Sequence, residues 1–167
     1  YSAIAAPATY KVPETIETVS AYAFIGNETT RTLDLSNFED LNEINGSFYD
    51  LLALKKIIFN DNVKVIPEYM FTGIGGLETL ELPTKLETIE KGGFSGCDDL
   101  KSVDLANTEN VEERAFYDCK SLQEIKSANR IKTIGTKAFS NCKELILISG
   151  NGGIESIGQD AFVGCAK

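Results

Sequence analysis

Hydrophobic residues recur along the chain at nearly fixed intervals, and phenylalanine marks the interval most clearly. Seven of the nine phenylalanines are separated by 24, 23, 23, 22, 23 and 23 residues: Phe24, Phe48, Phe71, Phe94, Phe116, Phe139 and Phe162. Aliphatic residues stand at fixed distances before and after most of them. A period in the twenties with several apolar columns predicts a stacked solenoid, because one coil cannot bury its inward face alone whereas a row of coils can.

Each coil contains a short alternation of apolar and polar residues, as in residues 80–82 and 103–105. This alternation predicts a short strand, and stacking the coils gives a parallel sheet on one face. The segments 89–97 and 134–142 are too short for a stable α-helix and predict a turn of helix or 3₁₀-helix on the return side. The fold class expected is a β-rich α/β solenoid, with a parallel sheet on one face and helical or 3₁₀ turns opposite.

Two stretches carry a recognisable motif. Residues 77–97 read LETLELPTKLETIEKGGFSGC, and residues 131–142 repeat its second half. The pattern L-x-x-I-x-L-P-x-x-L-x-x-I-x-x-x-A-F-x-x-C resembles the BspA-like leucine-rich repeat. The resemblance implies a right-handed solenoid, usually on bacterial or protist surface proteins and often associated with adhesion to host proteins.

The register defines the domain organisation. Residues 1–9 show no register and are expected to be a disordered lead, whereas Tyr10 and Val12 begin an incomplete first coil at the N-terminal edge. Residues 10–167 are expected to form one domain of about seven coils, a fragment of a longer protein.

Composition excludes several functions. A net charge of −9 without a basic block opposes binding to nucleic acid, which requires clustered Lys and Arg. The longest apolar runs, such as residues 145–148, are far shorter than the roughly 20 residues that span a bilayer, so no membrane insertion is expected. His is absent, which removes the usual base of nucleophilic triads. We therefore expect no enzyme, no catalytic residue, no cofactor and no metal site.

The four cysteines occupy one column: Cys97, Cys119, Cys142 and Cys165. In a small secreted protein, four cysteines would suggest a disulfide framework with three possible pairings. Equivalent positions of successive coils lie roughly 5 Å apart, but their Cβ atoms point in parallel rather than toward each other. The spacing favours reduced, buried thiols that act as small hydrophobic residues.

The outward residues of the predicted sheet form the candidate binding surface. They are Lys56, Ile58, Thr79, Glu81, Ser102, Asp104, Glu124, Lys126 and Leu147. Ile58, Ile146 and Leu147 are apolar where other coils are polar, and grouped exposed apolar residues mark contact sites. Ile146 and Leu147 could instead be a buried end if further coils follow.

Together these features predict a secreted or surface-displayed, adhesion-type protein-binding module that is a monomer. Its partner is expected to be a host or matrix protein, or a glycan. The alternative is an inert spacer or stalk that displays another domain.

Overall fold

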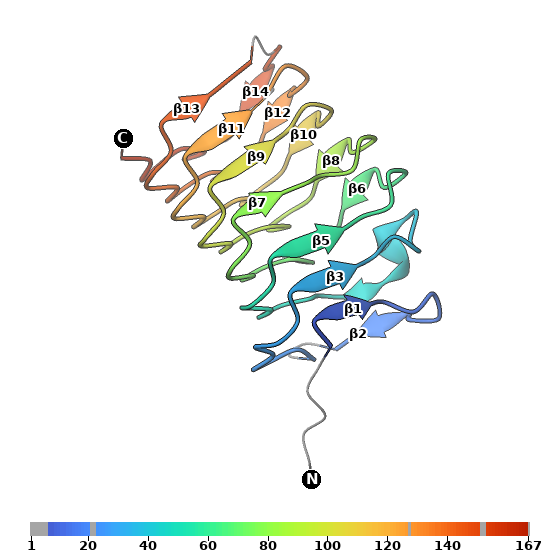
Figure 1. Ribbon diagram of the computed structural model, residues 1–167. Coiled ribbons are helices and arrows are strands. Elements are labelled where there is room, and N and C mark those ends of the chain that lie inside the picture. Colours follow the sequence, from blue (N-terminus) through green and yellow to red (C-terminus); the bar gives the residue numbers. More distant parts are fainter. Residues whose placement is uncertain (1–6, 21–22, 127, 151–152, 167) are drawn as a thin grey trace.

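The chain folds into a stack of parallel coils, each contributing one short strand to either side of the molecule (Figure 1). This computed structural model describes residues 7–20, 23–126, 128–150 and 153–166. The solenoid has about six turns, because the seven aligned phenylalanines enclose that many intervals. Within the expected lead, residues 1–6 lie outside the described residues, and Thr9 already belongs to a strand.

One side of the stack, here called the front side, carries the strands that the alternating residues predict. They are β1 (Thr9–Lys11), β3 (Thr32–Asp34), β5 (Lys56–Ile58), β7 (Thr79–Leu80), β9 (Ser102–Asp104), β11 (Glu124–Lys126) and β13 (Leu147–Ile148). They form two parallel sheets, of order β1-β3-β5 and β13-β11-β9-β7. The inward residue of each central strand is buried and the flanking residues face outward, as in β9 around Val103.

The return side also carries strands, which the sequence did not predict. They are β2 (Thr18–Val19), β4 (Asn45–Gly46), β6 (Val65–Ile66), β8 (Thr88–Ile89), β10 (Asn110–Val111), β12 (Thr133–Ile134) and β14 (Ser156–Ile157). The sheets here have the orders β2-β4 and β14-β12-β10-β8-β6. Among the described residues the only helical element is the 3₁₀-helix η1 (Leu41–Glu43), in the irregular second coil.

The expectation of helical or 3₁₀ turns on the return side is therefore wrong, and the hydrogen bonds around Phe94 give the reason. Alternate amides close β-turns: Gly93 donates to the Glu90 carbonyl at 3.1 Å. The amides between them donate to the next coil instead: Gly92 to Glu113, Phe94 to Ala115 and Gly96 to Tyr117, at 2.9, 2.8 and 2.7 Å. A 3₁₀-helix needs consecutive i→i+3 bonds, so amides shared with a neighbouring coil cannot form one.

Left-handed backbone conformations recur on both sides of each phenylalanine. Two residues after it stand Gly26, Asp50, Gly73, Gly96, Asp118, Asn141 and Gly164, all with positive φ. Two residues before it, Tyr69, Gly92, Arg114, Lys137 and Asp160 also have positive φ. A right-handed helix cannot pass through such residues, so each coil turns in short steps around its phenylalanine.

The aligned phenylalanines form a continuous column inside the stack. From Phe48 to Phe162, successive ring centroids lie 6.0, 5.3, 5.6, 5.4 and 5.5 Å apart, with interplanar angles of at most 15°. Since neighbouring coils are about 4.8 Å apart, these separations place the rings in offset stacks, the arrangement aromatic pairs favour. The column confirms the register read from the sequence.

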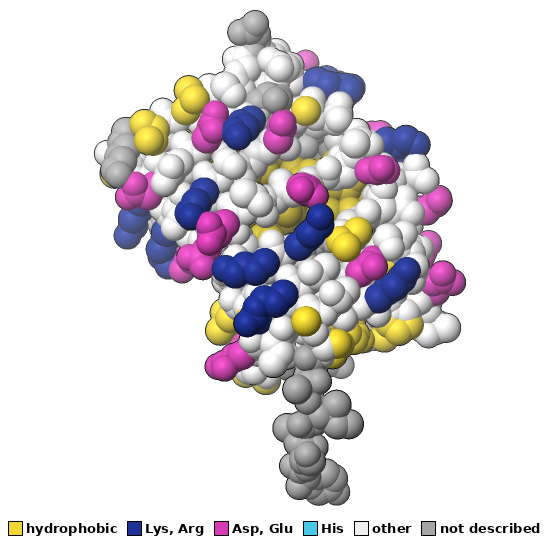
Figure 2. Space-filling model, viewed as in Figure 1, with side chains coloured by type: hydrophobic (Ala, Val, Ile, Leu, Met, Phe, Trp, Pro, Cys, Tyr) yellow, Lys and Arg dark blue, Asp and Glu magenta, His cyan; other side chains and the backbone are white. Residues whose placement is uncertain are grey.

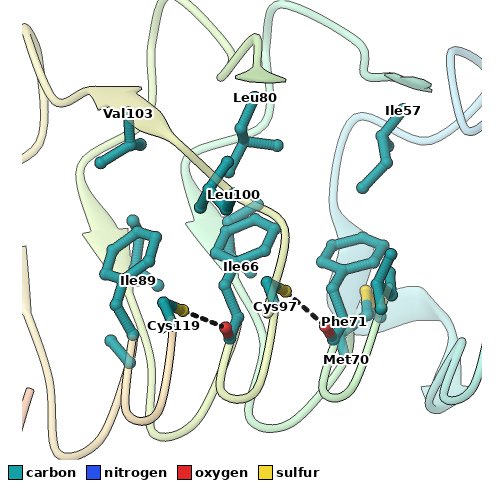
Figure 3. Close-up of a cluster of buried hydrophobic side chains, with 14 of the residues drawn as sticks. Ile57, Ile66, Met70, Phe71, Leu80, Ile89, Cys97, Leu100, Val103 and Cys119 are labelled. Atoms are coloured by element: carbon teal, nitrogen blue, oxygen red, sulfur yellow. Dashed lines mark hydrogen bonds between the residues drawn. The ribbon is translucent and has the colours of Figure 1, made fainter. Parts of the chain in front are cut away.

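The cysteines line a second buried column beside the phenylalanines (Figure 3). All four thiols are free, and Cys97, Cys119 and Cys142 are buried while Cys165 is half-buried. Each thiol donates to the carbonyl of the phenylalanine one coil earlier, as from Cys97 to Phe71 at 3.4 Å. The prediction of unpaired, buried thiols is confirmed for the first three.

Candidate functional site

The sheet register aligns the expected binding residues in rows across the front side. Thr79 pairs with Ser102, Ser102 with Glu124, and Glu124 with Leu147. Asp104 pairs with Lys126 in a second row, two residues further along the strands. Because side chains two residues apart point to the same face of a strand, both rows belong to one surface.

The structure places all the expected residues on the outer surface, to differing degrees. Thr79, Glu81, Asp104, Lys126, Lys56 and Leu147 are exposed, and Ser102, Glu124 and Ile58 are half-buried. Figure 2 shows positive and negative side chains interspersed over this view of the molecule, with apolar side chains visible in a recess between them.

Two ion pairs lie on this surface, one between neighbouring coils and one within a strand. Lys56 Nζ lies 3.5 Å from Glu81 Oε2 on the next coil, and Lys126 Nζ lies 3.5 Å from Glu124 Oε2 on its own strand. Exposed pairs of this kind contribute about 0–1 kcal/mol, so a partner can exchange them for its own charges at little cost.

A further row of alternating charge runs along the edge of the front side. Glu78 lies between Lys55 and Lys101, one on the coil before it and one on the coil after. The hydrogen bond from Lys101 lowers the pKa of the Glu78 carboxyl, so the carboxylate stays charged. Lys55, Glu78 and Lys101 are not among the residues predicted from the sequence, although each stands one residue before a member of the outward row.

A hollow of about 290 Å³ opens on the front side where β5 meets β7. Strand pairing is continuous within each of the two front sheets, and the hollow lies at their junction. Ile58, Phe59 and Leu82 supply its apolar wall, and charged side chains surround it: Lys56, Asp61 and Glu81. It therefore offers an apolar recess with a charged rim.

Phe59 is the residue of this hollow that sequence reasoning missed. Its ring meets Phe71 edge-on, with centroids 5.6 Å apart and an angle of 83°, so the core holds it in place. Phe38 and Phe59 are the two phenylalanines outside the repeat register. Phe38 is buried in the core, whereas Phe59 is half-buried at the hollow. Phe59 could have been selected from the sequence, because it is an aromatic residue outside the repeat register and directly follows Ile58.

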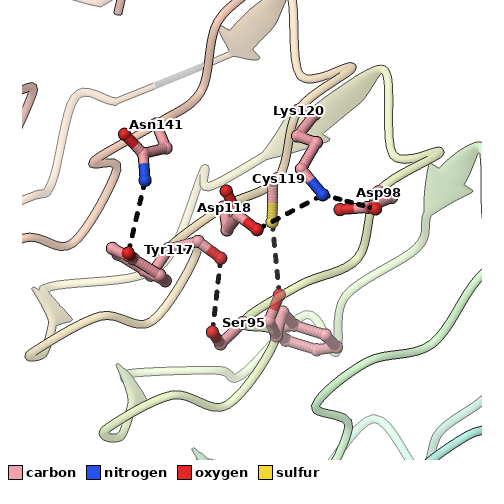
Figure 4. A network of polar contacts seen from close by, with 8 residues as sticks. Ser95, Asp98, Tyr117, Asp118, Cys119, Lys120 and Asn141 are labelled. Atoms are coloured by element: carbon pink, nitrogen blue, oxygen red, sulfur yellow. Dashed lines mark hydrogen bonds and ion pairs between the residues drawn. The ribbon is translucent and has the colours of Figure 1, made fainter. Parts of the chain in front are cut away.

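A polar network on the turns ties three coils together (Figure 4). Lys120 Nζ contacts Asp98 Oδ2 at 2.9 Å and Asp118 Oδ2 at 3.3 Å. Ser95 Oγ donates to the Tyr117 carbonyl, and Asn141 Nδ2 donates to the Tyr117 hydroxyl, both at 3.3 Å. Lys120 thus contacts one oxygen of each carboxylate and links its own coil to that of Asp98, which gives this network a structural role in holding coil spacing.

In the part of the chain that the structure describes, no cluster of three or more His, Cys, Asp or Glu side chains has a geometry that could hold a metal ion. Within the same residues, no helix has the length and apolarity required to span a membrane.

Parallel strands, stacked phenylalanines and an outward residue array define a leucine-rich-repeat solenoid. The family model of the BspA type leucine rich repeat region matches residues 7–108 and 42–167, in six copies. The chain therefore belongs to the BspA-type leucine-rich repeat family. No curated protein matches it.

Three solved structures are similar to the chain. A leucine-rich repeat protein of T. pallidum is 23% identical with a TM-score of 0.78, over 96% of this chain and 77% of that one. A leucine-rich repeat protein from Bacteroides ovatus is 24% identical with a TM-score of 0.68, over 84% and 39% of the two chains. A leucine rich cell surface protein from Faecalibacterium prausnitzii is 22% identical with a TM-score of 0.49, over 87% and 32%. The first two likenesses establish the fold.

Proposed function

We propose that the front side is a protein-binding surface and that the chain is an adhesion-type recognition module of a secreted or surface-displayed protein. The partner would be a host or matrix protein, with a glycan as the second candidate. Membership of the BspA-type family supports this class of function, because repeat solenoids present extended surfaces for binding.

The observation that carries the proposal is the hollow at the β5–β7 junction beside the aligned rows. Interfaces derive most of their affinity from a few apolar anchors that enter desolvated pockets, surrounded by polar contacts. Ile58, Phe59 and Leu82 provide such a pocket, and Lys56 and Glu81 stand at its rim. Thr79, Ser102 and Asp104 on β7 and β9 then extend the polar surface.

Rigidity supports the same reading. The rows on β7, β9, β11 and β13 are fixed by parallel pairing and by the phenylalanine column beneath them. A preorganised surface loses little conformational entropy on binding, which favours affinity.

The competing function is an inert spacer. The ion pairs of Lys56 with Glu81 and of Lys126 with Glu124 favour this function, because charges that are already paired within the molecule do not require a partner.

A binding assay with matched variants separates the two functions. The front variant changes Thr79, Glu81, Ser102, Asp104, Glu124 and Lys126 to Ala. The control variant changes six return-side and turn residues of matching composition: Thr136, Ser156, Glu87, Glu112, Glu155 and Lys132. Both lose three carboxylates, one lysine and two hydroxyls, so their net charges change equally.

The probes are a panel of purified matrix proteins and a glycan array. We expect the native chain and the control variant to bind one of the proteins and the front variant to lose that binding. A Phe59→Ala variant should weaken it by more than tenfold, since it removes the wall of the hollow. Equal binding by the front variant would overturn the proposal, and absence of any binding would favour the spacer.

A further inference from the structure

One corner of the stack, where the chain passes from the front side to the return side, is shorter than the corners beside it. The strand residues that bound three successive corners are paired across the sheets: Leu80, Val103 and Ile125 on the front side, and Thr88, Asn110 and Thr133 on the return side. The middle corner, residues 104–109, contains one residue fewer than residues 81–87 and 126–132. Because both of its ends are held in register with the neighbouring coils, the shorter connection takes a more direct path and leaves a recess between them.

A hollow of about 270 Å³ lies over this short corner and is here called the corner hollow. Its wall comes from the short corner, from the following coil and above all from the preceding coil, in that order Asn107 and Glu109, Arg130, and Thr84, Lys85 and Glu87. The corner hollow shares no lining residue with the hollow at the β5–β7 junction, so the two are separate candidate sites.

Polar side chains with unused hydrogen-bonding capacity line the corner hollow. Within the residues that the structure describes, the Asn107 amide and the Thr84 hydroxyl make no side-chain hydrogen bond. The Lys85 ammonium can donate several hydrogen bonds and makes one, of 2.7 Å from Nζ to Asn62 Oδ1. Polar groups that converge on one recess fix the orientation of a ligand. The lining therefore favours a ligand that carries several hydroxyl groups.

Positive charge exceeds negative charge around the corner hollow, although the chain as a whole carries a net charge of −9. The charged side chains of its lining are Lys64, Lys85, Arg130, Glu87 and Glu109. Glu109 accepts from Arg130 at 2.9 Å and from Lys132, just outside the lining, at 2.6 Å. Lys64 Nζ lies 2.9 Å from Glu87 Oε1, whereas Lys85 has no carboxylate partner among the described residues. Lys85 is thus the cation that remains available to an anionic ligand.

The two carboxylates restrict the class of anion. Hydrogen bonds from Lys132 and Arg130 lower the pKa of the Glu109 carboxyl, so this group stays ionised. The Glu87 and Glu109 carboxylates repel a compact anion with several charges, such as phosphate, but they accept hydrogen bonds from hydroxyl groups. A ring that carries hydroxyls and a single anionic group satisfies the free cation and the carboxylates together. Acidic sugars have this chemistry.

We propose that the corner hollow binds an acidic sugar, with Lys85 holding the anionic group and Asn107, Thr84 and Glu87 contacting the hydroxyls. Either a carboxylate or a sulfate ester meets the requirement for one negative charge. The site lies outside the rows of the front side and does not depend on the front-side proposal.

Three single variants test this site. Lys85→Gln removes the available cation. Lys143→Gln is its control, because it changes the net charge equally at an exposed position that does not line the hollow. Asn107→Trp leaves the charge unchanged and fills the recess with a large side chain. Circular dichroism establishes that each variant is folded.

The probes pair each acidic sugar with a neutral counterpart: sialyllactose with lactose, and trigalacturonate with its methyl ester. A heparin tetrasaccharide supplies sulfate esters, and inorganic sulfate supplies the ion alone. Heteronuclear NMR titration measures the affinity of each probe and reports which residues it contacts.

We expect an acidic sugar of this panel to bind the native chain and the Lys143→Gln variant alike, and its neutral counterpart to bind more weakly. The amide signals of residues 84–87 and 107–109 should shift on binding. Lys85→Gln should weaken the affinity about tenfold, because a hydrogen bond to a charged group is lost, and Asn107→Trp should abolish binding. The front variant keeps every lining residue of the corner hollow and should bind the sugar as the native chain does.

A folded native chain that binds none of the acidic sugars would overturn the proposal. Equal weakening by Lys85→Gln and Lys143→Gln would refute it as well, because the binding would then follow net charge alone. Inorganic sulfate that binds as tightly as the sugars would contradict it by showing an ion site without sugar recognition.

Discussion

The thiol of Cys119 donates a hydrogen bond to the carbonyl oxygen of Phe94, with Sγ and O 3.2 Å apart (Figure 3). The same contact recurs from Cys142 to Phe116 and from Cys165 to Phe139. The cysteine column therefore satisfies carbonyls of the turn as well as filling space in the core, which explains why a small polarisable donor suits this position.

Thiol reactivity should follow burial along this column. In dilute solution at neutral pH we expect Cys165 to react with a maleimide first, and Cys97, Cys119 and Cys142 to react only as the chain opens. In denaturant without reductant all four should be modified, as counted by mass spectrometry. Fewer than four additions would mean that a disulfide exists.

Stability should fall at alkaline pH because of the buried thiols. Burial raises the pKa of Cys142 from 9.0 to about 12, and it raises that of Cys119 well above its usual range. Between pH 9 and about pH 12, the Cys142 thiol of the unfolded chain releases its proton, whereas the same thiol in the folded chain retains it. The free energy of unfolding is then unaffected below pH 9 and decreases above it, by about 1.4 kcal/mol per pH unit for each such thiol.

Urea unfolding of the native chain and a Cys142→Ala variant at several pH values checks this. The variant lacks one titrating thiol, so its stability should decline less steeply with pH. Parallel declines would show that Cys142 does not contribute.

The phenylalanine column should be most sensitive at its centre. Phe94 is fully buried between Phe71 and Phe116, so Phe94→Ala should lower the free energy of unfolding by about 3–5 kcal/mol. Phe162 is only half-buried at the last coil, so Phe162→Ala should cost clearly less. Equal losses in urea titrations would contradict the structure.

Left-handed turn positions should gain stability from glycine. Lys137 has a φ of 56°, a conformation that costs a non-glycine residue roughly 1–2 kcal/mol. Lys137→Gly removes that cost and loses about 0.5–1 kcal/mol through the greater freedom of the unfolded chain, so a net gain of about 0.5 kcal/mol is expected.

Lys143→Gly is the matched control, because the backbone there is not left-handed. It should lower stability by about 0.5–1 kcal/mol. The same sign for both variants, measured by thermal or urea unfolding, would refute the conformational argument.

Sequence reasoning predicted the solenoid because its main determinant, burial, is written in the spacing of apolar residues. The columns of Phe94 and Cys97 could be read directly. The conformation of the turns could not be predicted from the spacing of apolar residues. It depends on whether each backbone amide donates its hydrogen bond within its own coil or to the next coil. The Gly, Asp or Asn two residues after each phenylalanine, as at Gly96 and Asn141, was the signal that would have excluded a helix.

The candidate site was predictable only in part. Alternation placed Thr79 and Ser102 on the outside, and the structure adds that they lie side by side. The hollow beside Ile58 and Phe59 depends on where the front sheet divides, between β5 and β7, and no pattern within a single coil encodes such a junction.

The amides that link each turn to the next coil run along the axis of the stack, as do the bonds of both rows of strands. A load applied between the two termini therefore pulls along these hydrogen bonds and can break them sequentially, one coil at a time. Each step would release about 23 residues, or roughly 75–80 Å of extended chain. Under such a load the molecule would lengthen in increments of one coil, and the coils not yet opened would keep their folded length.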